Sequence, residues 1–226
     1  MRPKLINGDV KDVLRTLDPE SIQCVVTSPP YWGLRNYQVD KQLGLEKTPQ
    51  EYIENMVSVF QEVKRVLKNN GTVWLNLGDS YAGSNGSRGI TENTPSIKKG
   101  DKMLLNRIKG GNFTGYKKEG MPIISPESIG LKHKDLVGIP WRVALALQAD
   151  GWYLRSDIIW NKTSMITESV TDRPTKSHEY IFLLTKSAKY YYNMDAIREP
   201  LASSSVSRLN QNIQQQIGTT RANAGA

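Results

Sequence analysis

Residues 22–32 read IQCVVTSPPYW, and this stretch decides the fold class. Its first six residues form a near-continuous apolar run, of the kind that is buried in a parallel sheet. Pro29 and Pro30 end the strand pattern, because proline has no amide hydrogen to give to a sheet. In open parallel sheets, ligands bind beyond the carboxyl ends of the strands, so we expect the loop of residues 27–32 to lie where chemistry takes place.

The segments on both sides of this stretch alternate between strand and helix patterns. Residues 4–8 are a short apolar piece that reads as a strand, and residues 10–17 have helical spacing. A long helix is expected to begin at Thr48 and Pro49, which suit the N-cap and the first helical position, and to stop at residues 69–71, Asn-Asn-Gly.

The same alternation continues to residue 184. Residues 71–77 read as a strand, residues 139–150 as a helix, and residues 156–160 and 180–184 as strands. Alternating strands and helices predict an α/β fold with a mainly parallel sheet and helices on both faces. Cys24 is expected to be a buried spacer in its strand, and Trp160 to belong to the core.

Composition excludes several classes of protein. No apolar run approaches the roughly 18 residues that span a bilayer, and the N-terminus has no signal-peptide pattern, so we expect a cytoplasmic protein. Cys24, His133 and His178 form no recognisable zinc pattern, and no metal is expected. The net charge of +8 favours a nucleic-acid partner only mildly.

The proline pair makes residues 27–32 a rigid loop of hydrogen-bond acceptors. Two consecutive prolines fix the backbone, and the carbonyls of Ser28 and Pro29 are expected to point outward. An aromatic residue, Tyr31, follows directly. A rigid acceptor loop beside an aromatic ring suits a planar amine.

Ser28 to Tyr31, Ser-Pro-Pro-Tyr, match position for position the signature loop of the S-adenosylmethionine-dependent DNA amino-methyltransferases, and the chain resembles this family. The resemblance extends to residues 5–9, 71–79 and 152–192. It implies a Rossmann-like methyltransferase sheet, S-adenosylmethionine as cofactor, and double-stranded DNA with a flipped target base as substrate. Residues 1–200 would then form the catalytic domain, and residues 201–226 a polar, flexible tail.

The chemistry of an exocyclic amine fits this loop. The amine is a poor nucleophile because its lone pair is delocalised into the ring of the base. Ser28 Oγ and the Pro29 carbonyl would accept its two hydrogens and free the lone pair, while Pro30 stiffens the loop and Tyr31 stacks on the flipped base. Ring-carbon methylation is disfavoured, because it uses a cysteine that typically follows a proline and Cys24 follows Gln23.

Two carboxylates are candidates for cofactor binding. The resemblance places Asp9 in a loop that contacts the cofactor, and Asp79 ends a strand on the same predicted edge. Each has a simpler alternative: Asp9 as the N-cap of the helix that begins at Val10, and Asp79 as a turn residue after Gly78.

Residues 83–134 have few apolar positions and no sustained period, and they read as a basic loop insertion in the catalytic domain. Residues 84–120 carry eight basic and three acidic side chains. We expect the insertion to follow the phosphate backbone of DNA, and the alternative is a solvated loop. The residues assigned to DNA contact are Lys98, Lys99, Lys102, Arg107, Lys109, Lys117, Lys118 and, outside the insertion, Lys162.

Family members with this motif order carry a cofactor loop resembling Asp-Pro-Phe-x-Gly-x-Gly after the recognition region, and residues 186–226 contain none. The resemblance therefore implies a fold that is incomplete at the C-terminus, from a truncated reading frame or from a split enzyme with a complementary chain. Serine at the first motif position is commoner in cytosine enzymes, so the expected reaction is N4 methylation of cytosine in a restriction-modification system. N6 methylation of adenine and a non-catalytic DNA-binding remnant are the alternatives.

Overall fold

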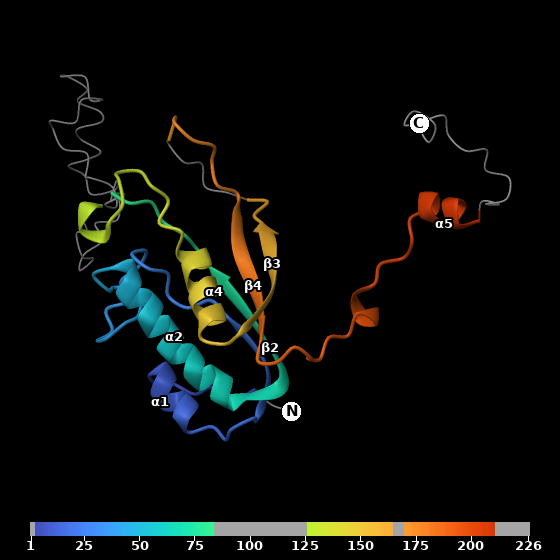
Figure 1. Cartoon of the computed structure of the whole chain (residues 1–226), viewed down its shortest axis with the longest axis horizontal. Helices are drawn as coiled ribbons and strands as arrows, with labels where there is room; N and C mark the ends of the chain where they lie inside the picture. The colour runs from blue at the N-terminus through green and yellow to red at the C-terminus, as the bar shows by residue number, and fades with distance from the viewer. Residues whose placement is uncertain (1–2, 84–125, 165–169, 211–226) are drawn as a thin grey trace, which may run out of the picture. The chain divides into compact units, whose positions relative to one another are not determined.

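The structure is a computed structural model that describes residues 3–83, 126–164 and 170–210 (Figure 1). The chain divides into two compact units, Met1–Tyr191 and Tyr192–Ala226. The first unit contains the sheet and its helices. The second contains η2 (Asp195–Ile197) and α5 (Ser203–Leu209), and neither has a buried residue.

The sheet has four strands, β1 (Ile22–Thr27), β2 (Leu67–Leu77), β3 (Tyr153–Asn161) and β4 (His178–Thr185), in the order β1-β2-β4-β3. The predicted α/β class is confirmed, although the sheet is mixed: β1 and β2 pair in parallel, whereas β4 runs antiparallel to both β2 and β3. Three strands share one direction, yet β4 separates β3 from the other two. An apolar run carries no information about strand direction, and antiparallel neighbours need no crossover helix.

Three helices of the first unit are α1 (Val10–Arg15), α2 (Pro49–Val66) and α4 (Ile139–Ala149), and a short 3-10 turn, η1, covers Glu127–Ile129. As predicted, α2 begins with Thr48, whose side chain accepts a hydrogen bond from the amide of Glu51. Its predicted stop at residues 69–71 is wrong. The helix ends at Val66, because Leu67 is already extended and pairs with Ile22 as the first residue of β2.

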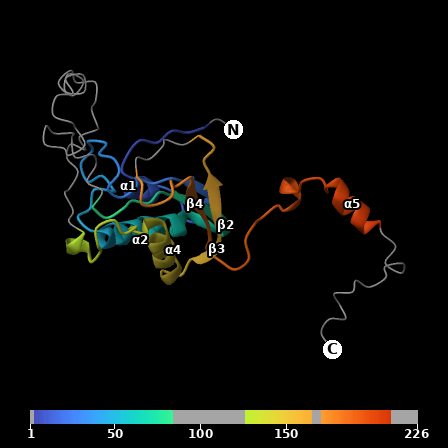
Figure 2. The same ribbon diagram turned by 90° about the horizontal axis from the view of Figure 1, so that it is seen from above.

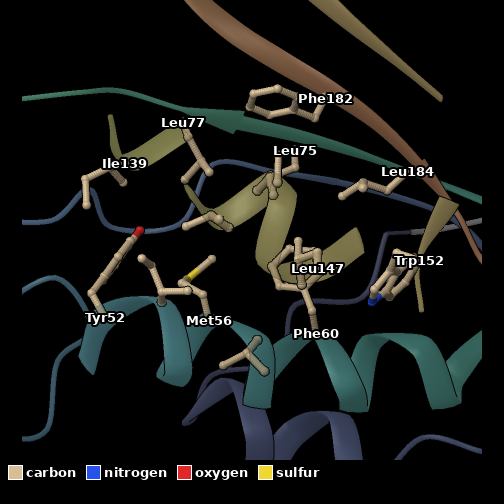
Figure 3. Close-up of a cluster of buried hydrophobic side chains, with 14 of the residues drawn as sticks. Tyr52, Met56, Phe60, Leu75, Leu77, Ile139, Leu147, Trp152, Phe182 and Leu184 are labelled. Carbon is tan, nitrogen blue, oxygen red and sulfur yellow. The ribbon is translucent and has the colours of Figure 1, made fainter. Parts of the chain in front are cut away.

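The core lies between the sheet and the helix pair α2 and α4, which pack against each other (Figure 1, Figure 2). Both helices cover the same face, whereas helices on both faces were predicted; α1 packs against α2. Figure 3 shows side chains from these elements meeting in one layer. The buried residues drawn there include Tyr52, Met56 and Phe60 of α2, Ile139 and Leu147 of α4, and Leu75, Leu77, Phe182 and Leu184 of the sheet.

The other face of β1 is open in the described part of the chain. Val26 is 79% exposed and Cys24 is exposed, so the predicted burial of this strand on both faces, and of Cys24, is wrong. The strand predicted at residues 4–8 does not form, and Leu5 is 99% exposed. Among the described residues β1 is an edge strand, and residues 4–8 do not pair with its free edge.

No helix in the described ranges has the length and apolar character needed to cross a membrane.

Candidate active site

The polar residues of the candidate site gather at one edge of the sheet. The carboxyl ends of β1, β2 and β3 meet there, and β4 begins there, since Thr27 pairs with Leu75, and His178 with Asn161. This edge brings together Ser28 after β1, Asn76 near the end of β2 and Glu179 at the start of β4. Ligands bind at such edges in α/β folds, as the sequence predicted for the Ser-Pro-Pro-Tyr loop.

Four oxygen atoms at this edge form four pairs within hydrogen-bond distance. The Tyr31 hydroxyl is 2.7 Å from Asn76 Oδ1, 3.1 Å from Glu179 Oε2 and 3.1 Å from Ser28 Oγ. Ser28 Oγ also lies 3.2 Å from Asn76 Oδ1. We call Ser28, Tyr31, Asn76 and Glu179 the oxygen cluster. It contains two residues from the predicted catalytic loop and two that no sequence motif assigned to the site.

The ring of Tyr31 is held against the backbone of Gly78. A Cβ atom at Gly78 would overlap Tyr31 Cε2, so no side chain fits between the backbone and the ring. The pKa of the Tyr31 hydroxyl is raised above 10.0, chiefly by burial and further by the negative charge of Glu179, although the hydrogen bond from Ser28 opposes the shift. Tyr31 therefore stays neutral at physiological pH.

The backbone of the loop is pinned to the core on its inner side. The Tyr52 hydroxyl of α2 donates to the Pro30 carbonyl at 2.9 Å, and burial raises the pKa of that phenol. Trp32 is buried and its Nε1 donates to the Glu46 carbonyl at 3.0 Å. Within the described ranges the Pro29 carbonyl accepts no hydrogen bond, and its contact with a ligand stays a prediction.

Glu179 is the link between the oxygen cluster and a cation. Lys162 Nζ lies 3.3 Å from Glu179 Oε1 and 3.3 Å from the centre of the Trp160 ring. Trp160 is 46% exposed, so its predicted place in the core is wrong. It belongs to β3, an edge strand of the described sheet, and α4 covers the sheet face opposite to the one on which Trp160 lies. The predicted contact of Lys162 with DNA stays a prediction, since the structure gives its ammonium an internal partner.

Asp9 and Asp79 both act as helix caps. Asp9 accepts hydrogen bonds from the amides of Lys11 and Asp12 at the start of α1, as the simpler interpretation proposed. Asp79 Oδ1 accepts from the amides of Ser80, Gly138 and Ile139, and so satisfies the start of α4, where Gly138 has no side chain to do it. Cofactor contact by either carboxylate remains a prediction.

A pocket of about 890 Å³ lies next to Asp9, between α1, α2 and residues 36–46. Its volume is in the range of small-molecule sites, about 300–1,000 Å³. Carboxylate and amide side chains of Asp9, Asn36, Gln38 and Asp40 line it, and such groups suit the hydroxyls of a ribose. No member of the oxygen cluster lines this pocket.

The pocket and the signature loop are nevertheless joined through the backbone. The carbonyl of Gly44, which lies between the lining residues Leu43 and Leu45, accepts a hydrogen bond from the amide of Gly33 at 2.8 Å. Gly33 follows the predicted loop of residues 27–32 directly. The wall of the pocket is therefore tied to the end of that loop.

The seven basic residues assigned to DNA contact in the insertion, from Lys98 to Lys118, lie outside the described residues. In the part of the chain that is described, no group of three or more His, Cys, Asp or Glu residues could hold a metal ion.

The comparisons with known proteins agree with the signature loop. A family model described as DNA methylase, for N6 and N4 methyltransferases, matches residues 22–221. The type II methyltransferase M.Cfr9I of Citrobacter freundii is 49% identical over 195 residues, which cover 86% of this chain and 58% of the relative. M.SmaI of Serratia marcescens is 48% identical over 208 residues, which cover 92% of this chain and 64% of the relative. The chain thus spans about three fifths of the length of these relatives.

Among solved structures, the PvuII DNA methyltransferase, a cytosine-N4-specific enzyme, matches with a TM-score of 0.52 and 15% identity, over 84% of this chain and 51% of that one. This likeness supports the Rossmann-like methyltransferase fold. The match to the family model covers most of the chain, including the Ser-Pro-Pro-Tyr loop and all four strands. The chain therefore belongs to the DNA methylase family of N6 and N4 amino-methyltransferases.

Proposed function

We propose that this chain serves in the transfer of a methyl group from S-adenosylmethionine to the exocyclic N4 amine of cytosine in DNA. The observation that carries the proposal is the oxygen cluster at the carboxyl edge of the sheet, next to the free Pro29 carbonyl. A cluster of acceptors suits a group that brings hydrogens, and an exocyclic amine brings two.

The residues of the loop prepare the amine for attack. Ser28 Oγ and the Pro29 carbonyl accept its two hydrogens, which draws the nitrogen toward tetrahedral geometry and frees its lone pair. Bound S-adenosylmethionine supplies a methyl group on a positively charged sulfur. No covalent intermediate with the protein would be needed, because the nitrogen–carbon bond would form as the sulfur–methyl bond breaks; S-adenosylhomocysteine would leave, and the methylated amine would release one proton to solvent. The second face of the Tyr31 ring, away from Gly78, is the proposed stacking surface for the flipped base.

The pocket beside Asp9 is the proposed position of the nucleoside part of the cofactor. Its size and its acceptor side chains fit a ribose, and Asp9 keeps its second carboxylate oxygen for this role while Oδ1 caps α1. We further propose that a glycine-containing cofactor loop completes this site, either in a longer form of this chain or in a complementary chain.

The experiment that tests the function identifies the methylated nucleoside. DNA is incubated with the protein and isotopically labelled S-adenosylmethionine, digested to nucleosides and analysed by mass spectrometry. Labelled N4-methylcytosine is the expected product. Labelled N6-methyladenine as the product would show that the target base is adenine and not cytosine. DNA binding without any affinity for S-adenosylmethionine would identify a non-catalytic remnant instead.

A further inference from the structure

The oxygen cluster contains more acceptor positions than hydrogens. Its four oxygen–oxygen pairs, between 2.7 and 3.2 Å apart, each need one hydrogen. Only the hydroxyls of Ser28 and Tyr31 carry one, so two hydrogens must serve four pairs. Adjacent acceptors without a hydrogen between them repel each other, and the free energy of an unmet acceptor in a partly buried site is high.

The remaining two members of the cluster cannot supply the missing hydrogens. Asn76 Nδ2 donates to the Tyr180 carbonyl at 3.1 Å, which directs Asn76 Oδ1 toward the cluster. The ammonium of Lys162, 3.3 Å from Glu179 Oε1, stabilises the ionised carboxylate. Glu179 therefore presents only acceptors to Tyr31, and the deficit of two hydrogens is built into the site.

We propose that Glu179 makes this site selective for a base that presents an amine, by keeping the oxygen cluster two hydrogens short. This inference rests on the proposed function and assigns a role to a residue outside the signature loop. The N4 amine of cytosine brings one hydrogen to Ser28 Oγ in this cluster and one to the Pro29 carbonyl beside it, whereas uracil and thymine bring a carbonyl oxygen at the same ring position and add a further acceptor. Glu179 acts through Tyr31, as a specificity-determining and positioning residue.

The cluster is accessible to such a base. Ser28 is exposed, Asn76 and Tyr31 are partly exposed, and the side chain of Glu179 keeps 27% of its accessible surface. Each of these residues lies at the strand edge where ligands bind in this fold class. A flipped base can therefore reach the acceptors without displacing the core.

The variant that tests the idea is Glu179→Gln, which keeps the size of the side chain and adds two hydrogens. The new amide donates one hydrogen to Tyr31, which lowers the deficit of the cluster from two to one and reduces the preference for an amine. Tyr31→Phe is the second variant, because it removes the hydroxyl that three of the four oxygen pairs share. The matched control is Glu20→Gln, which removes a carboxylate from another ion pair, with Lys186 at 3.1 Å.

The measurement is binding by fluorescence anisotropy to two labelled duplexes that differ in one base. One carries a single cytosine and the other a single uracil, each opposite an abasic site, so that the cost of unpairing is removed. We expect the unchanged protein and Glu20→Gln to bind the cytosine duplex about tenfold more tightly, as one well-placed hydrogen bond in a desolvated site allows. Both Glu179→Gln and Tyr31→Phe should bind the two duplexes with affinities within about twofold of each other.

Two results would contradict the inference in distinguishable ways. Equal binding of the two duplexes by the unchanged protein, or a preference for cytosine that survives in Glu179→Gln and Tyr31→Phe, overturns the role of Glu179 and leaves the methyltransferase proposal standing. Absence of binding to either duplex overturns the proposed function together with this inference.

Discussion

At the scale of single residues, the site depends on a close approach between Tyr31 and Gly78. The hydroxyl of Tyr31 reaches Asn76 and Glu179 because its ring lies directly over the backbone at Gly78. Gly78 does not have a positive φ, so space rather than backbone freedom requires glycine there. The sequence pattern indicates Gly78 only as part of a turn, because the ring it accommodates lies 47 residues earlier in the chain.

Gly78→Ala should displace the Tyr31 ring and lower the free energy of unfolding by about 1–3 kcal/mol, the usual cost of overpacking. Urea denaturation measures this decrease. The control is the double-mutant cycle with Tyr31→Ala, since a clash with the ring disappears when the ring is absent. If Gly78→Ala cost as much in the Tyr31→Ala background as in the unchanged protein, the contact with Tyr31 would not be the reason for this glycine.

The sequence predicted the half of the site that is local in the chain. Ser28 and Tyr31 share one motif, so their joint role followed from four consecutive residues. Asn76 and Glu179 join them across 48 and 148 positions, and no spacing rule connects residues that far apart. The family resemblance included Glu179 without a role, and the missing information was the antiparallel direction of β4, which brings its first residues to the catalytic edge.

At the scale of elements, α4 depends on a cap from outside the helix. Its N-cap residue Gly138 has no side chain, and Asp79 Oδ1 accepts hydrogen bonds from the amides of Gly138 and Ile139 instead. Ile139 is buried, so these amides have little access to water as an alternative partner. The carboxylate therefore ties the end of β2 to the start of the helix that covers the sheet.

Asp79→Ala should lower the free energy of unfolding by about 2 kcal/mol, the upper end for removal of a cap, because α4 contributes to the core. Asp79→Asn keeps an oxygen acceptor and should recover most of this stability. Asp9→Ala is the comparison: it removes the cap of α1, a helix without buried residues, and should cost about 0.5 kcal/mol. Unchanged denaturation of Asp79→Ala, together with failure to bind S-adenosylmethionine, would favour the cofactor role over the cap.

The two ends of α2 show which element boundaries can be predicted from the sequence. Thr48 and Pro49 marked the start of α2 because capping is a local property of the chain. The end of α2 was misplaced, since the Asn-Asn-Gly signal at residues 69–71 was outweighed by pairing of Leu67 with Ile22 in the sheet. Tertiary pairing, which no window of sequence contains, decided that boundary.

At the scale of the whole molecule, positive charge is concentrated in the insertion, as the sequence shows. Residues 84–120 carry eight basic and three acidic side chains, or +5 of the net +8. A basic segment that follows a phosphate backbone releases counterions on binding, and its contribution is measured by the dependence of affinity on salt.

Replacing Lys98, Lys99 and Lys102 with alanine should weaken binding to all DNA sequences alike. The slope of log affinity against log salt should flatten by about 0.9 for each phosphate that the protein no longer touches. The control replaces Lys4, Lys47 and Lys68, which are exposed elsewhere, and lowers the net charge from +8 to +5 in the same way. If both triple variants have the slope of the unchanged protein, the insertion does not bind DNA, and residues 163–177 become the candidate recognition segment.

The direct join of α2 to β2 limits how this chain can change in length during evolution. Val66 is the last helical residue and Leu67 the first of the strand, so no loop separates them to absorb an added residue. One insertion in the helix would turn its apolar face by about 100° against the core, and one in the strand would exchange the two faces of β2. The second change would bury Asn76 and turn Val73 and Leu75 outward. Insertions and deletions among descendants of this chain should therefore avoid this junction and accumulate in segments such as residues 198–202, which lie outside the helices and strands and outside the candidate site.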